Sequence, residues 1–129
     1  MVRAEAVIVA GIGFRSVARS ADISGIVARA RELSGHAIDL LAVPEFKQRH
    51  PALLEALSDL GLPLVAIAPW RLERAQGRCP TRSAAAMAAV GVGSVAEACA
   101  LAALEDGRLV LPRITSAQAT CALAMGYSS

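Results

Sequence analysis

A pair of closely spaced glycines followed by an arginine is the first group of residues in this chain that suits the binding of an anion. Gly11 and Gly13 end an apolar run, and Arg15 comes two residues later. Glycine permits positive φ angles and a close approach of backbone to ligand. A helix that starts after such a turn points its first N–H groups back at it. The pattern predicts a buried strand, a glycine turn and a helix; a tight turn with nothing bound is the alternative.

The single lysine of the chain comes after a second apolar run. Of the 13 basic residues, Lys47 is the one lysine and the others are arginines, whose planar guanidinium suits carboxylate or phosphate. Arg71 follows a third apolar run. Because the carboxyl ends of parallel strands meet at one edge of a sheet, where ligands of such folds bind, we expect Arg15, Lys47 and Arg71 to converge there. A solvated surface lysine is the plainer interpretation of Lys47.

The start of a predicted helix holds the third group of residues whose types and spacing could do chemistry. The sequence Ser94-Val95-Ala96-Glu97 has the spacing of a capping box, in which a Ser hydroxyl and a Glu carboxylate satisfy the first N–H groups of a helix. Ser94 is not in a nucleophile elbow, because no strand precedes it. Glu97 is therefore either a helix cap or a group able to activate water.

The elements that position these residues alternate between strands and helices. Strands are expected from residue 6 up to the glycine turn that begins at Gly11, and near residues 38–43, 64–68, 108–111 and 119–124. Helices are expected at 20–34, 51–60, 83–90 and from 94 to about 106, with a polar loop at 73–82 and a turn at 112–116. This alternation predicts a single α/β domain spanning residues 1–129. It has three layers, α/β/α, around a mostly parallel sheet of about five strands with an antiparallel C-terminal strand.

Composition excludes several classes of partner. A formal net charge of +2 is too small to indicate nucleic acid. Residues 83–104 are long enough to cross a bilayer, but alanine dominates them and glycines interrupt them, so no membrane association is expected. Cys79, Cys99 and Cys121 are widely spaced, with no metal-binding pattern; this predicts no metal site and a cytoplasmic location. The third glycine of a dinucleotide fingerprint is missing, so no cofactor is expected.

Several motifs occur in a set order along nearly the whole chain. They are a strand ending Val-Ala-Gly-Ile-Gly-Phe-Arg, a lysine after the second strand, Leu-Gly-Leu-Pro-Leu before the third, Cys79-Pro80-Thr81, the segment from Gly91 to Leu101, and a strand ending Leu-Pro-Arg. Their order and spacing resemble the CobE and CbiG C-terminal domain family of cobalamin (vitamin B12) biosynthesis. The resemblance implies a small α/β domain that acts in corrin-ring synthesis.

The family resemblance implies two possible roles. In the anaerobic pathway the similar domain is the C-terminal part of a lactone-opening hydrolase that releases acetaldehyde. In the aerobic pathway it is a free-standing protein thought to bind or hand on corrinoid intermediates. This sequence has no counterpart of the hydrolase's additional N-terminal part, so the free-standing type is expected. The residues that match the family pattern are Gly11, Gly13, Arg15, Lys47, Ser94 and Glu97. Arg113 replaces a common lysine, Thr81 replaces a common serine, and Phe14 holds a variable position.

The expected function is therefore the binding or carrying of an acidic corrinoid precursor, such as hydrogenobyrinic acid. Its expected ligand-binding residues are Gly11, Gly13, Phe14, Arg15, Lys47, Ser94, Val95, Glu97 and Arg113. One alternative is a hydrolase of the precorrin δ-lactone, in which Lys47 holds the substrate and Glu97 positions or activates water. The other is a non-catalytic module that binds corrin-pathway enzymes.

Overall fold

Five strands form one mixed sheet in the computed structural model, which describes residues 6–82, 87 and 94–128. The strands are β1 (Ala6–Phe14), β2 (Leu40–Pro44), β3 (Leu64–Ile67), β4 (Leu104–Thr115) and β5 (Ala119–Ser128). Their order across the sheet is β3-β2-β1-β5-β4. The pairs β1–β2 and β2–β3 are parallel, whereas β5 runs antiparallel to both of its neighbours. Four strands therefore point the same way, and the predicted α/β class with an antiparallel last strand is confirmed.

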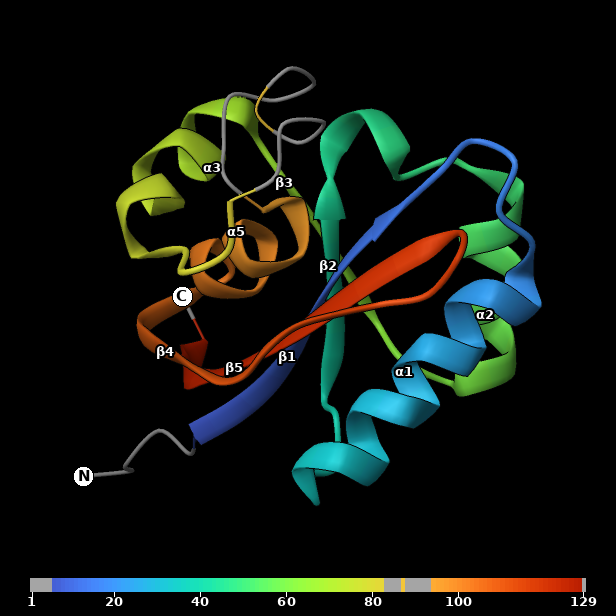
Figure 1. Cartoon of the computed structure of the whole chain (residues 1–129), viewed down its shortest axis with the longest axis horizontal. Coiled ribbons are helices and arrows are strands. Elements are labelled where there is room, and N and C mark those ends of the chain that lie inside the picture. The colour runs from blue at the N-terminus through green and yellow to red at the C-terminus, as the bar shows by residue number, and fades with distance from the viewer. Residues whose placement is uncertain (1–5, 83–86, 88–93, 129) are drawn as a thin grey trace.

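Helices cover both faces of the sheet and make three layers (Figure 1). Within the described residues they are α1 (Ser20–Ser34), α2 (Pro51–Leu60), α3 (Pro69–Ala75) and α5 (Val95–Ala102), with short 3-10 helices η1 (Glu45–Lys47) and η2 (Gln76–Arg78). Helices α1 and α2 pack on one face, and α3 and α5 on the other. No helix in the described part of the chain is long and apolar enough to cross a membrane.

Strand β1 explains why the apolar run at the start of the chain is continuous. Ile8, Ala10 and Ile12 belong to the core beneath α1 and α2, whereas Val9 belongs to the core beneath α3 and α5. Successive side chains of a strand point to opposite faces. A strand covered on both faces must therefore be apolar at nearly every position.

The predicted glycine turn is wrong. Gly11 and Gly13 lie inside β1, and the glycines with positive φ among the described residues are Gly35 and Gly61, which end α1 and α2. The packing of α5 against β1 explains why residue 11 is a glycine. A Cβ atom at that position would lie 1.9 Å from the carbonyl oxygen of Ala96 in α5. The close approach that the glycine permits is thus to a helix of the same chain.

Several predicted boundaries are also wrong. The polar stretch predicted as a loop at 73–82 continues α3 to Ala75 and forms η2, and Cys79 is buried in the core. The helix that follows Ser94 ends at Ala102, because β4 already begins at Leu104 to pair with the last residues of β5. The predicted turn at 112–116 is largely strand. The predicted helix at 83–90 lies outside the described residues except at position 87.

Candidate functional site

The ends of three strands and the start of α5 meet at one edge of the sheet, which we call the carboxyl edge. Thr120 of β5 pairs with Gly13 of β1 on one side and with Thr115 of β4 on the other, so β1 and β4 end at the same level. A Cβ atom at Gly13 would lie 3.5 Å from the Cβ of Val95, which places the start of α5 above that end of β1.

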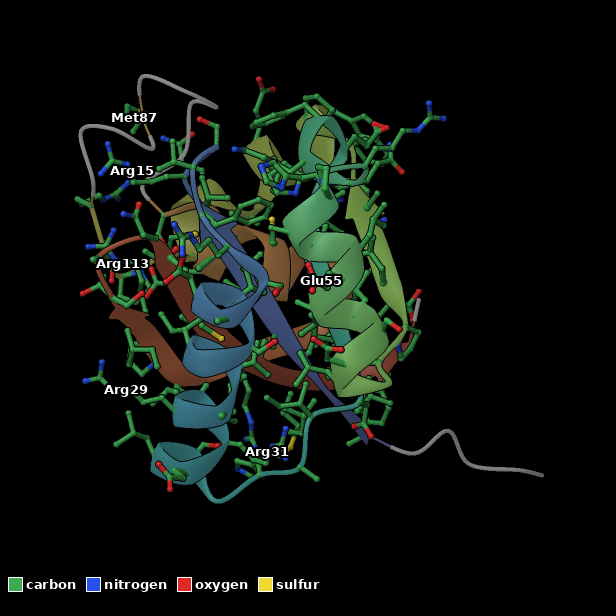
Figure 2. All side chains as sticks on the ribbon, turned by 90° about the vertical axis from the view of Figure 1, so that its right-hand side faces the viewer. Arg15, Arg29, Arg31, Glu55, Met87 and Arg113 are labelled. Atoms are coloured by element: carbon green, nitrogen blue, oxygen red, sulfur yellow. The ribbon has the colours of Figure 1, made fainter. Side chains whose placement is uncertain are left out.

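Arginines from two of these strands lie on the same side of the molecule. Arg15 directly follows β1, is exposed, and donates its backbone N–H to the carbonyl oxygen of Gln118 over 3.0 Å. Arg113 is half-buried near the end of β4. Figure 2 shows both on one flank, with Arg29 of α1 further along it. Strands β1 and β4 are separated by β5, so they are about 10 Å apart.

Lys47 joins this edge through an aromatic contact. Its Nζ lies 4.8 Å from the centre of the Phe14 ring at the end of β1, a distance that allows a cation–π interaction. Partial burial lowers the pKa of Lys47 from its ordinary value, because a charged ammonium loses hydration there. The expected convergence of the first two strand ends is therefore seen at Phe14 and Lys47.

His50 supports Phe14 from the start of α2, a role that sequence reasoning missed. The rings of Phe14 and His50 meet edge to face with centres 5.1 Å apart. The Nδ1 atom of His50 accepts the N–H of Ala52 over 3.1 Å and caps α2, and Nε2 lies 2.9 Å from the carbonyl oxygen of Ser16. This pair of contacts assigns the neutral tautomer with hydrogen on Nε2. No sequence pattern marks such a contact, because its partner is 34 residues away.

Glu97 is fully buried at the start of α5 and binds two other segments of the chain. Its Oε1 accepts the N–H of Thr81 over 2.9 Å, and its Oε2 accepts the Thr81 hydroxyl over 2.9 Å. Oε2 also accepts the N–H of Arg113 over 3.0 Å. A break in the register of β4 between Leu111 and Ile114 turns that N–H out of the strand ladder.

The predicted capping role of Ser94 is observed, but the carboxylate of the expected capping box is turned elsewhere. Ser94 is buried, and its hydroxyl accepts the N–H of Glu97 over 3.2 Å. The Glu97 carboxylate instead links α5 to Thr81 and to β4. Both side chains therefore face the protein interior, whereas Arg15, Lys47 and Arg113 retain access to solvent.

Two further predicted positions are not part of the open edge. Gly11 is buried beneath α5. The expected convergence of Arg71 with Lys47 is not observed, since its guanidinium donates to the carbonyl oxygen of Ala102, at the opposite end of α5 from Ser94. Within the described residues, no cluster of histidine, cysteine or acidic side chains could hold a metal ion.

The fold and the edge together define a class: a small α/β domain with cationic side chains at the ends of its strands. The model of the family described as "Cobalamin synthesis G C-terminus" matches residues 8–124 of the chain. The chain therefore belongs to this family. A search of curated protein sequences gave no match.

Solved structures agree with the family. The crystal structure of CobE, a protein from the cobalamin (vitamin B12) biosynthetic pathway, is 28% identical with a TM-score of 0.89, over 100% of this chain and 97% of that one. The cobalamin biosynthesis protein chiG from Agrobacterium tumefaciens is 40% identical with a TM-score of 0.76, over 93% and 98%. A putative cobalamin biosynthesis protein G homolog from Sulfolobus solfataricus, 19% identical, shares the fold with a TM-score of 0.70; the match covers 92% of this chain and 36% of that one. This chain is accordingly a CobE/CbiG-like protein of the cobalamin pathway.

Proposed function

We propose that this protein binds an acidic corrin precursor, such as hydrogenobyrinic acid, at the carboxyl edge and carries it without changing it. The observation that carries the proposal is the contact of Lys47 with Phe14, beside the cationic side chains of Arg15 and Arg113. Arg15 follows β1, Lys47 follows β2 and Arg113 lies near the end of β4, so the three cations are spread along one edge of the sheet.

The chemistry of the ligand matches that edge. A corrin precursor is a broad, flat ring with carboxylates around its rim, so it requires separated cations and an apolar surface. Arginine binds carboxylate through paired N–H donors, and lysine acts as a compact charge. Val17 and Phe46, in the segments that follow β1 and β2, are 66% and 65% exposed. They would supply apolar contacts next to Arg15 and Lys47.

The hydrogen bonds of Glu97 favour carrying over hydrolysis. A general base must accept a proton from the attacking water within hydrogen-bond reach. Both oxygens of this fully buried carboxylate already accept hydrogen bonds from Thr81 and Arg113. Ser94 is occupied as a helix cap. The candidate acid–base group of the hydrolase alternative is therefore engaged in holding the fold.

Titration with hydrogenobyrinic acid, followed by its visible absorption, tests the proposal. We expect saturable binding that weakens with salt. The double variant Arg15→Gln/Lys47→Gln should bind at least about tenfold more weakly, since a hydrogen bond to a charged group contributes about 1.5–3 kcal/mol. Arg31→Gln, which changes an exposed arginine of α1, is the matched control and should bind like the parent protein.

Two results would contradict the proposal. One is an unchanged affinity in the double variant. The other is release of acetaldehyde from a lactone-bearing precursor, which would support the hydrolase instead. Co-elution with a corrin-pathway enzyme in the absence of ligand would favour the third role, that of a partner-binding module.

A further inference from the structure

A hollow lies at the opposite end of α5 from Ser94. Its volume is about 600 Å³, and its walls come from α3, the C-terminal end of α5 and the start of β4. Small-molecule sites commonly have volumes of about 300–1,000 Å³. None of its lining residues belongs to the carboxyl edge described above, so we call it the α3 cavity.

Three guanidinium groups line the α3 cavity, and contacts with the chain hold each in place. Arg71 donates to the carbonyl oxygen of Ala102, and Arg78 donates to the carbonyl oxygen of Gly107. The central carbon of the Arg74 guanidinium lies over the indole of Trp70, 5.8 Å from the ring centre, within the range of a cation–π interaction. Such contacts reduce the side-chain entropy lost when a ligand binds.

The cations of the α3 cavity keep donors for a ligand. Glu105 and Asp106 also line it, yet in the part of the chain that the structure describes neither carboxylate lies within ion-pair distance of a guanidinium. Each arginine carries five N–H donors, and Arg71 and Arg78 each use only one group on a carbonyl. With three cations against two carboxylates, the lining has a charge of +1.

We propose that the α3 cavity is a second binding site, for a small aromatic molecule that carries an oxyanion, either carboxylate or phosphate. Guanidinium groups recognise both kinds of oxyanion through paired N–H donors. Trp70 is 57% exposed beside them and offers an aromatic surface for a flat ring. The carboxylates of Glu105 and Asp106 would accept hydrogen bonds from hydroxyl or amine groups of such a molecule.

The fluorescence of Trp70 reports on the α3 cavity directly, because it is the single tryptophan of the chain. We would titrate the protein with adenosine 5′-monophosphate and with benzene-1,3,5-tricarboxylate, exciting at a wavelength that neither probe absorbs. We expect a saturable change with at least one of them. A response to the monophosphate alone identifies phosphate as the oxyanion that binds, and a response to the tricarboxylate alone identifies carboxylate. Adenosine, which lacks the oxyanion, should bind at least about tenfold more weakly than its monophosphate.

Arg74→Gln is the cleanest variant, since its described contact is with Trp70 alone and its loss should not disturb the fold. It should weaken binding about tenfold, and Arg31→Gln should not. Isothermal titration of Trp70→Phe gives a second measurement that is independent of fluorescence. Lys47→Gln should leave this binding intact, so the α3 cavity and the carboxyl edge are tested separately. No saturable response to either probe, or an equal response in Arg74→Gln, would overturn the proposal.

Discussion

Lys47 is partly and Glu97 is fully removed from water, and the protein accommodates the two side chains in different ways. Lys47 keeps part of its solvent contact and lies over the Phe14 ring, which attracts a cation. Glu97 has no solvent contact, and donors from Thr81 and Arg113 replace its hydration. One group therefore remains available to a ligand, while the other is committed to the structure.

The charge of Lys47 should make ligand binding depend on pH. Burial lowers the pKa of Lys47 from 10.5, so the ammonium deprotonates at a lower pH than an ordinary lysine. Binding of hydrogenobyrinic acid should therefore weaken as pH rises toward 10. Lys47→Arg should remain charged and retain binding over that range. Titrations at several pH values between 7 and 10 test this, and identical profiles for the two proteins would contradict it.

Replacement of Glu97 should reduce stability even without any ligand. In Glu97→Gln the NH2 group of the amide must face an N–H group that donates a hydrogen bond to the carboxylate in the parent protein. This mismatch should lower the free energy of unfolding by about 1–3 kcal/mol. Urea unfolding measures this loss. Glu55→Gln on α2 is the matched control, because Glu55 is exposed (Figure 2) and its replacement should change stability by less than about 0.5 kcal/mol. Equal stability of the two variants would mean that the contacts of Glu97 contribute nothing.

Sequence reasoning at the residue scale found charged groups but not their partners. The spacing of Ser94 and Glu97 predicted a helix start, because capping is a local interaction. The contacts of Glu97 with Thr81 and Arg113 span 16 residues in either direction, and only the folded chain brings them together. The same is true of His50 beneath Phe14.

At the scale of elements, the packing of α5 on β1 depends on two glycines with unequal tolerance. A Cβ at Gly11 would lie 1.9 Å from a backbone oxygen of α5, which cannot move alone. A Cβ at Gly13 would lie 2.6 Å from the Thr120 hydroxyl, which can rotate away. The two positions look alike in the sequence, but the backbone of α5 lies against Gly11, whereas the atom nearest to Gly13 is a side-chain hydroxyl.

Alanine substitutions should rank these positions. Gly11→Ala should destabilise the protein by about 3 kcal/mol, at the upper end of overpacking effects, because α5 must shift. Gly13→Ala should have a smaller effect. Gly25→Ala in α1, where nothing lies within 4 Å of the added carbon, should raise stability by about 0.5–1 kcal/mol. Thermal unfolding of the three variants tests the order, and a milder effect at Gly11 than at Gly13 would contradict the packing argument.

Local patterns predicted some elements well and others poorly. The ends of α1 and α2 were correctly predicted, because Gly35 and Gly61 adopt the left-handed conformation that glycine favours at helix ends. The prediction failed around Pro112, which was expected to lie in a turn. Strand β4 is at the edge of the sheet and has irregular register there, so a residue without an N–H is tolerated within it.

At the scale of the whole molecule, branched aliphatic residues, alanines and cysteines fill the core, and no aromatic side chain of the described residues is fully buried in it. Cys79, Cys99 and Cys121 are free and buried. Burial raises the pKa of Cys79 to about 11 and that of Cys121 to about 12, and it also raises the pKa of Cys99. These thiols are therefore poorly reactive in the folded protein at neutral pH.

Stability should fall in alkaline solution. Above pH 9, the ordinary value for these thiols, the unfolded chain releases their protons while the folded chain keeps them. Unfolding therefore becomes more favourable as pH rises from 9 toward 11. The lowered pKa of Lys47 has the opposite effect on stability, but it involves one side chain, whereas three thiols contribute to the decline. Urea unfolding at pH 8 and pH 10 under reducing conditions measures the change. Cys79→Ala should show a smaller decline, and an equal decline would exclude Cys79 as a source.

The position of β5 in the sheet has a consequence for how the protein is made. Residues 119–128 form a strand between β1 and β4, so the last of the five strands along this domain joins the first to the edge strand. While the nascent chain still holds residue 128 inside the ribosome, β1 lacks one of its two neighbours. The finished sheet can form only after this segment emerges, and shortened products that lack it should be cleared by cellular proteases instead of accumulating.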